Sequence, residues 1–224
     1  MGDSFTKGYL MSLIDEAERL ISSDPFGEER PPVSYTLKEK EERREDPLES
    51  VYREASSCRL CQACSGRRMF AHPVVASGPK VLFIAPSPEG SVIFSPESLL
   101  KFRAWWELSL LLHPGEWALT TLIKCPSSPF SPSAADQCRP FLRSEMSMMK
   151  PEAMVLLGHD TACYMLRRSV PMDEMRQKRF VVNHIPVFVT YTPLDYLHTP
   201  SLQRDIWNDM LFIRREIGTE GRKR

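Results

Sequence analysis

Residues 58–61 read Cys-Arg-Leu-Cys, a stretch in which Cys58 and Cys61 can face one point because two intervening residues let the backbone turn back. Two more cysteines, Cys125 and Cys138, follow far downstream, where the local pattern predicts a strand end and a helix. Four thiolates of one site suit either zinc or an iron–sulfur cluster, and spacing alone does not separate the two. If the four cysteines close one site, they tie the start of the globular domain to its middle.

The composition suits a single α/β domain with an appendage. Of the 224 residues, 42% are hydrophobic, which is enough for one buried core. Lys plus Arg and Asp plus Glu both number 29, so the net charge is zero and any nucleic-acid binding would need a local basic patch. The chain opens with no signal-peptide pattern, and no apolar run approaches the ~20 residues that span a bilayer. We therefore expect a cytoplasmic protein without a membrane partner, whose six cysteines are ligands or buried thiols rather than disulfides.

The sequence divides into four segments. Apolar residues at spacings of three and four over residues 8–22 predict an amphipathic helix, which makes 1–22 an N-terminal helical segment. Residues 23–47 are rich in Pro, Glu, Lys and Arg, and predict a charged flexible linker. The domain proper is expected over residues 48–218, and a basic tail over 219–224.

Within the domain, short apolar runs alternate with helical patterns. The predicted strands are residues 80–85, 117–123, 153–157, 180–182 and 187–191. The predicted helices are residues 47–56, 95–113, a segment from about 131 that carries Cys138 and meets a bend or break at Pro140, 159–168 and 201–217. This alternation predicts a largely parallel sheet covered by helices on both faces. Ligands bind at the carboxyl ends of such strands, so Pro86, Thr121 and Thr192 mark the expected pocket.

The order of the motifs resembles the family 4 uracil-DNA glycosylases over roughly residues 58–217. The motifs are Cys58-x-x-Cys61 with Gly66-Arg67, Lys124-Cys125 at a strand end, a Pro-rich loop, Cys138, Leu156-Leu157-Gly158, and Thr192-Pro193 before a loop that closes at Pro200. The resemblance implies a three-layer α/β/α sandwich with a mostly parallel central sheet. It also implies DNA as the partner, and a 4Fe-4S cluster held by Cys58, Cys61, Cys125 and Cys138, with zinc as the alternative. Cys64 matches a position that is not a ligand in that family.

Three segments that matter for uracil excision depart from the family pattern. Family members have Gly-Glu-Ala-Pro-Gly after the first strand, and Pro86 stands here at the position of the acidic residue. Thr121 stands where the family has an asparagine that would read the uracil edge, and Thr192 where it has a histidine. Proline offers no side-chain acceptor to orient water, and a threonine hydroxyl replaces neither an amide nor an imidazole. The exchanges predict weak or absent uracil excision.

Other residues are candidates for binding or for a replacement reaction. Glu89 is the carboxylate nearest to Pro86 on its loop and is the candidate catalytic base. The expected base pocket contains Pro86, Ser87, Phe94, Thr121 and Thr192. The expected nucleic-acid contacts are Arg176, Tyr196, Leu197 and His198, of which residues 194–197 are predicted to form a loop that wedges into DNA.

Three functions fit these features. The first is a glycosylase-like protein that keeps the fold and cluster, binds nucleic acid, and has lost or changed its base chemistry. The second is an active DNA glycosylase with a rebuilt pocket that uses Glu89. The third is a scaffold with a structural cluster, which binds a protein partner through the helix at residues 8–22.

Overall fold

A computed structural model of the chain describes residues 47–66 and 70–220, without the side chains of Thr219 and Glu220. The predicted helix at residues 8–22, the linker except for its last residue, and residues 221–224 of the predicted tail lie outside the described residues. In the described part, no helix combines the length and the apolar character needed to cross a membrane.

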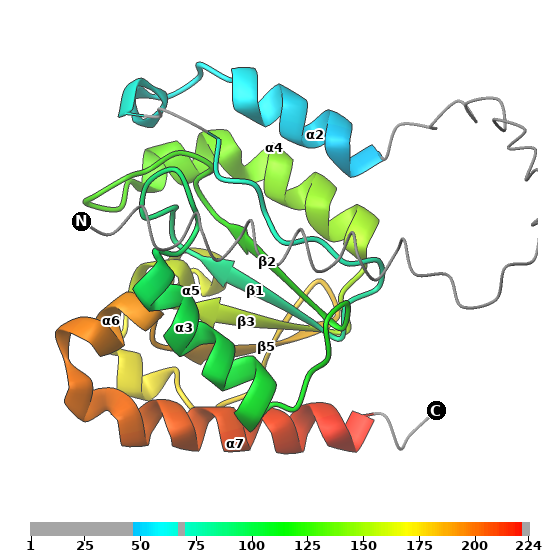
Figure 1. Ribbon diagram of the computed structural model, residues 1–224, viewed down its shortest axis with the longest axis vertical. Helices are drawn as coiled ribbons and strands as arrows, with labels where there is room; N and C mark the ends of the chain where they lie inside the picture. The colour runs from blue at the N-terminus through cyan, green and yellow to red at the C-terminus, as the bar shows by residue number, and fades with distance from the viewer. Residues whose placement is uncertain (1–46, 67–69, 221–224) are drawn as a thin grey trace, which may run out of the picture. The chain divides into compact units, whose positions relative to one another are not determined.

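A five-stranded sheet forms the centre of the domain (Figure 1). Its strands are β1 (Val81–Ala85), β2 (Trp117–Thr121), β3 (Ala153–Leu157), β4 (Phe180–Val182) and β5 (Ile185–Thr190), in the order β2-β1-β3-β5-β4. The first four strands of that order run parallel, and β4 pairs antiparallel with β5 at one edge. Every residue of β1, β2 and β3 is buried, as expected for strands covered on both faces. The predicted mostly parallel sheet is confirmed.

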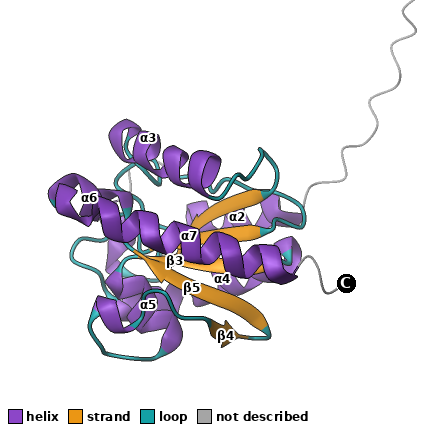
Figure 2. Cartoon of the chain, turned by 90° about the horizontal axis from the view of Figure 1, so that it is seen from below, coloured by secondary structure: helices purple, strands orange, loops and turns teal. Residues whose placement is uncertain are grey.

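Helices cover both faces of this sheet (Figure 2). Alternate residues of β1 face opposite ways: Phe83 joins an apolar cluster with α3 (Pro96–Ala104) and α7 (Gln203–Glu220), whereas Ile84 joins a second cluster. The second cluster lies under α2 (Pro47–Ser57), α4 (Pro132–Met149) and α5 (His159–Leu166). The α/β class and the three-layer arrangement are therefore confirmed.

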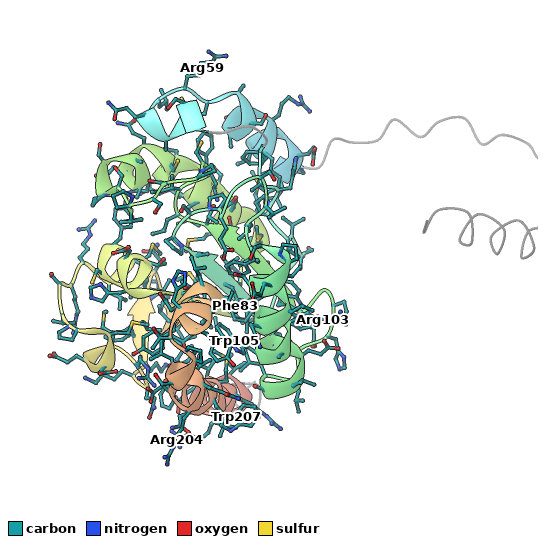
Figure 3. The ribbon with its side chains drawn as sticks, turned by 60° about the vertical axis from the view of Figure 1, so that its left-hand side comes forward. Arg59, Phe83, Arg103, Trp105, Arg204 and Trp207 are labelled. Atoms are coloured by element: carbon teal, nitrogen blue, oxygen red, sulfur yellow. The ribbon has the colours of Figure 1, made fainter. Side chains whose placement is uncertain are left out.

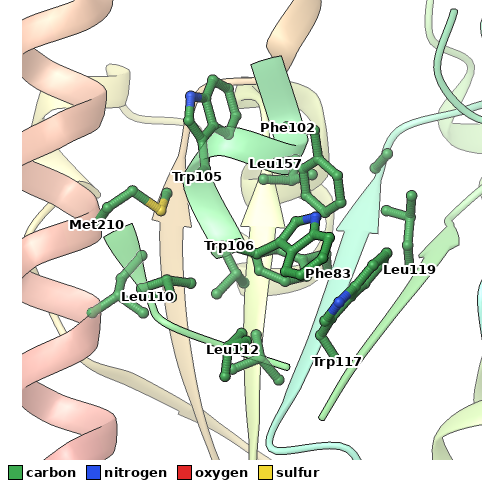
Figure 4. Packing of buried hydrophobic residues seen from close by; sticks show 14 of the residues in the cluster. Phe83, Phe102, Trp105, Trp106, Leu110, Leu112, Trp117, Leu119, Leu157 and Met210 are labelled. Carbon is green, nitrogen blue, oxygen red and sulfur yellow. The ribbon is translucent and has the colours of Figure 1, made fainter. Parts of the chain in front are cut away.

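Aromatic side chains fill the layer between the sheet and α3 (Figure 4). The Phe83 and Phe102 rings meet edge to face with centroids 4.9 Å apart, and Trp106 lies against Trp117 at 4.6 Å. The predicted single helix over residues 95–113 is shorter in the structure: α3 passes into a wide-turn π-helical segment, η2 (Trp105–Ser109), and the chain leaves it at Leu111 with a positive φ of 55°. Trp105 and Trp106 of this segment are both buried in the core.

Helix α4 carries Cys138, one of the four candidate cysteine ligands. Ser131 begins it as an N-cap, its hydroxyl accepting a hydrogen bond from the Ala134 N–H, and Lys150 ends it in the left-handed region. Pro140 was expected to bend or interrupt this helix, but α4 runs through it for 18 residues. The Pro140 ring lies on the exposed side of the helix.

Candidate functional site

The loops after β1 and β2 lie against each other at the carboxyl ends of the strands. The Ile123 N–H donates to the Pro86 carbonyl at 3.0 Å, and the Ser87 hydroxyl donates to the Ser127 carbonyl at 3.2 Å. Thr121, the last residue of β2, is in register with the last residue of β1. Three of the five expected pocket residues, Pro86, Ser87 and Thr121, therefore lie together where the parallel strands end. We call this side of the sheet the strand-end edge.

Thr121 is 2% exposed, so its side chain is covered by protein. Its backbone carbonyl accepts a hydrogen bond from the Lys124 ammonium at 2.8 Å. A buried hydroxyl of this kind offers one polar group where a carboxamide would offer a paired donor and acceptor.

Thr192 caps the helix that follows β5. Its hydroxyl accepts from the Asp195 N–H at 3.0 Å, while the Asp195 carboxylate accepts from the Thr192 N–H at 2.8 Å, which is a complete capping box. The helix is α6 (Pro193–His198), so the expected loop at residues 194–197 is helical, and that prediction was wrong. Prediction missed the Thr192-Pro193-x-Asp195 pattern, which is a helix-start signal in the sequence itself.

Gly158 connects the end of β3 to Thr192. Its N–H donates to the Thr190 carbonyl at 2.8 Å, and a Cβ at this position would lie 2.8 Å from Cγ2 of Thr192. Its backbone, with φ 85° and ψ 158°, is in a region that only glycine adopts readily. The strand-end edge is thus closely packed around Thr192.

Glu89 is held on the loop before α3. Its Oε2 accepts from the Ser95 N–H and from the Ser98 hydroxyl, both at 3.0 Å, so the carboxylate helps to begin α3. Phe94 is buried, with its ring centroid 5.1 Å from that of Phe102. The structure places Phe94 in the apolar core, and the proposed catalytic role of Glu89 stays a prediction.

Arg176 is directed inward rather than to the surface. Its side chain is 7% exposed, and it pairs with Asp209 through Nε at 2.8 Å and also with Asp173 and Asp205. Burial alone would lower the pKa of Arg176, but the hydrogen bonds and charge of Asp209 raise it above its usual value. Its donors are therefore used by the protein's own carboxylates, which argues against the expected phosphate contact.

The other three expected nucleic-acid contacts share one short helix. Tyr196, Leu197 and His198 lie on α6, where Tyr196 packs against the apolar cluster that contains Phe83. The Lys101 ammonium lies 5.1 Å from the Tyr196 ring centroid. Of the three side chains, His198 is the exposed one.

The candidate cysteine ligands come from three segments. Cys58 follows α2, Cys61 precedes η1 (Gln62–Gly66), and both are half-buried, while Cys125 and Cys138 are buried. Burial raises the pKa of the Cys138 thiol, a hydrogen bond from the Lys124 backbone lowers it, and the nearby charges of Cys61 and Cys58 raise it further.

An open hollow of about 980 Å³ separates the Cys-x-x-Cys turn from the loop after β2. Its lining includes the candidate ligand Cys61. It also includes Pro126, which follows Cys125 in the sequence, and Gln137, which precedes Cys138. Soft thiolate donors are the right chemistry for zinc or an iron–sulfur cluster. Within residues 47–66 and 70–220, however, no three or more His, Cys, Asp or Glu side chains are grouped closely enough to hold a metal ion, so the ligand set stays a prediction.

A buried ion pair that sequence analysis missed lies beside this site. The Lys124 ammonium contacts both carboxylate oxygens of Glu145, at 2.8 and 2.7 Å, and the two side chains are 2% and 0% exposed. The Thr120 hydroxyl donates to Glu145 at 2.8 Å and lies 2.7 Å from the Lys124 ammonium. Because Lys124 precedes Cys125 and Glu145 lies two turns after Cys138, the pair joins the two elements that carry these cysteines.

The comparisons with known proteins agree with this architecture. The model of the uracil DNA glycosylase superfamily matches residues 72–211 of the chain. The chain belongs to the uracil DNA glycosylase superfamily. It is also 22% identical over 192 residues to the Type-4 uracil-DNA glycosylase of Saccharolobus solfataricus, a match that covers 78% of this chain and 88% of that protein. The superfamily match includes Cys125 and Cys138, whereas Cys58 and Cys61 precede it.

Proposed function

We propose that this superfamily member binds nucleic acid, most simply DNA, and that its ability to excise uracil is weak or lost. The superfamily match supports nucleic acid as the partner, and the contacts of Thr192 support the loss of uracil excision. The Thr192 hydroxyl accepts the capping hydrogen bond of α6, and its side chain is packed close to Gly158, so it stabilises the fold. A hydroxyl used in this way cannot supply the charge or donor strength of an imidazole to a departing base.

The other two exchanged positions offer no replacement. Pro86 has no side-chain polar atom, and Thr121 is covered by protein. Loss of one well-placed group in an enzyme costs ~3–4 kcal/mol of transition-state stabilisation. Three unreplaced losses therefore predict a rate of uracil release close to background, while binding through phosphate contacts can persist.

The proposed cofactor is a 4Fe-4S cluster held by Cys58, Cys61, Cys125 and Cys138, with zinc as the alternative. The soft donor set supports this assignment, as does the hollow lined by Cys61 and by Pro126 and Gln137, the sequence neighbours of Cys125 and Cys138. When bound, the cluster would supply metal–thiolate bonds that link the segment after α2 to β2 and α4. Anaerobic purification, a visible absorption spectrum and metal analysis test it: iron at about four per chain supports the cluster, and zinc without iron contradicts it.

The uracil-release assay uses the same metal-loaded protein. Oligonucleotides that contain a single uracil, in single-stranded and duplex form, are incubated with it and with an active family 4 enzyme. We expect DNA binding without release above the protein-free background. Release at a turnover similar to the active enzyme would contradict the proposed loss of activity.

A second candidate is an active glycosylase with a rebuilt pocket. The observation in its favour is that Glu89 is held in a defined position by Ser95 and Ser98, on the loop that follows the strand-end residue Pro86. A screen over damaged bases, followed by Glu89→Gln on any substrate found, tests it. A loss of at least ~100-fold in turnover supports Glu89 as the base, and an unchanged turnover excludes that role.

A further inference from the structure

A groove of about 530 Å³ lies between α4, α5 and the turn that joins β4 to β5. Its floor is apolar and includes Leu122, Leu142 and Ile185. Leu122 directly follows Thr121, so the groove begins beside the strand-end edge and continues over the face of the sheet that carries α4. The volume lies within the range of about 300–1,000 Å³ that is usual for ligand sites.

Three arginines line this groove. Arg139 and Arg143 extend from successive turns of α4, about 6 Å apart along the helix axis, and Arg167 ends α5. None of the described residues that line it is an aspartate or glutamate. In a protein whose net charge is zero, the groove is a local concentration of positive charge.

The three arginines differ in what they already contact. Arg139 forms an ion pair with Asp136 and donates to the Tyr164 hydroxyl from Nε at 3.2 Å. The Tyr164 hydroxyl in turn donates to Asp136 at 2.8 Å, which fixes this wall of the groove. Arg143 and Arg167 are exposed, and neither forms an ion pair with another residue that the structure describes. Two guanidinium groups from different helices are therefore available to a ligand.

We propose that this groove binds the phosphates of a single nucleic-acid strand through Arg143 and Arg167. The inference rests on the proposed nucleic-acid binding and adds a second contact region outside the strand-end edge. Guanidinium groups match phosphate oxygens with two parallel hydrogen bonds, which favours phosphate as the charged ligand. The apolar floor and the Tyr164 ring provide a surface for sugars and bases between the phosphates.

The test compares two pairs of substitutions that remove the same charge. The groove variant is Arg143→Gln with Arg167→Gln, and the control is Arg204→Gln with Arg214→Gln on α7, which packs on the other face of the sheet. Arg204 projects from α7 in Figure 3. Binding of a labelled twelve-nucleotide oligothymidylate to the full chain, loaded with its metal, is measured by fluorescence anisotropy between about 50 and 300 mM salt.

Loss of two phosphate contacts should reduce the slope of log K against log salt by about 1.4, and weaken binding at 0.1 M salt at least about tenfold. The α7 control should match the unsubstituted protein. Because all four arginines are exposed, both variants should unfold at the temperature of the unsubstituted protein, which circular dichroism checks.

Each other result overturns the inference in an identifiable way. If the unsubstituted protein binds the oligonucleotide and the groove variant shows the same slope of log K against log salt, the groove is not the binding site. The proposed nucleic-acid function would then still stand. An equal loss in both variants would indicate a net-charge effect only. If thymidine monophosphate or a glutamate dodecapeptide competes as well as the unlabelled oligonucleotide, the groove binds anions in general and not a nucleic-acid strand. No binding by the unsubstituted protein would remove the proposed nucleic-acid function and this inference together.

Discussion

The cysteine-bearing segments and the strand-end edge are neighbours, since only three residues separate Thr121 from Cys125, yet they keep the family's residues to different degrees. All four expected cluster cysteines are present, whereas the three residues expected to act on uracil are exchanged. One of the exchanged residues has a structural role, because Thr192 caps α6. Under the proposed function, the residues that would bind the cluster are present, and the residues that would serve only uracil excision are replaced.

The strongest test of this comparison is the loss of a cysteine. Cys138→Ser should abolish iron binding and the visible absorption, because a cluster that lacks a buried thiolate ligand is incomplete. Iron per chain is measured after anaerobic purification. Cys163→Ser, which changes a half-buried thiol on α5, is the matched control and should keep the iron content. Full iron content in Cys138→Ser would remove Cys138 from the ligand set.

The buried ion pair allows a second test, because Lys124 lies between the two regions. Lys124→Met leaves the Glu145 carboxylate buried without its partner, and should lower the free energy of unfolding by ~3–5 kcal/mol. Lys124→Met combined with Glu145→Leu should recover most of that loss, since both charges are then gone. Urea unfolding of the three proteins measures the difference. A double variant no more stable than Lys124→Met would show that the pair contributes more than neutralisation of two charges.

Much of the fold could be predicted because its signals are local. The runs at residues 80–85 and 153–157 are continuous and apolar, and β1 and β3 lie there. The helix at Ser131 was equally visible, since the cap and the following proline stand next to each other in the sequence. Such patterns predict an element without reference to anything distant in the chain.

The site was harder to predict because its residues act through long-range contacts. Nothing near Arg176 in the sequence reveals that Asp209 will take its donors, 33 positions later. The pairing of Lys124 with Glu145 is also invisible in the sequence, because each residue alone resembles an ordinary surface charge. The groove arginines fall between these cases. The spacing of Arg139 and Arg143 along α4 is local, but it is the folded chain that pairs Arg139 with Asp136 and leaves Arg143 and Arg167 without an ion pair among the described residues.

Gly158 tests how closely the strand-end edge is packed. Gly158→Ala should destabilise the protein by ~1–3 kcal/mol, because the backbone there is in a region that only glycine favours. Part of the cost comes from the new Cβ, which would lie 2.8 Å from Cγ2 of Thr192. In a Thr192→Ser background that methyl group is absent, so the same substitution should cost less but still be unfavourable. Equal costs in both backgrounds would assign the whole effect to the backbone.

The smallest expected effect separates the fold role of Thr192 from any role in chemistry. Thr192→Ala removes the N-cap of α6 and should lower stability by about 1 kcal/mol, whereas Thr192→Ser keeps the hydroxyl and should stay within a few tenths of the parent. Thermal unfolding monitored by circular dichroism resolves such a difference. If the hydroxyl serves the fold alone, neither substitution should change uracil release or oligonucleotide affinity beyond the loss of folded protein. If uracil release changes by more than the loss of folded protein explains, in Thr192→Ala but not in Thr192→Ser, the Thr192 hydroxyl takes part in the reaction.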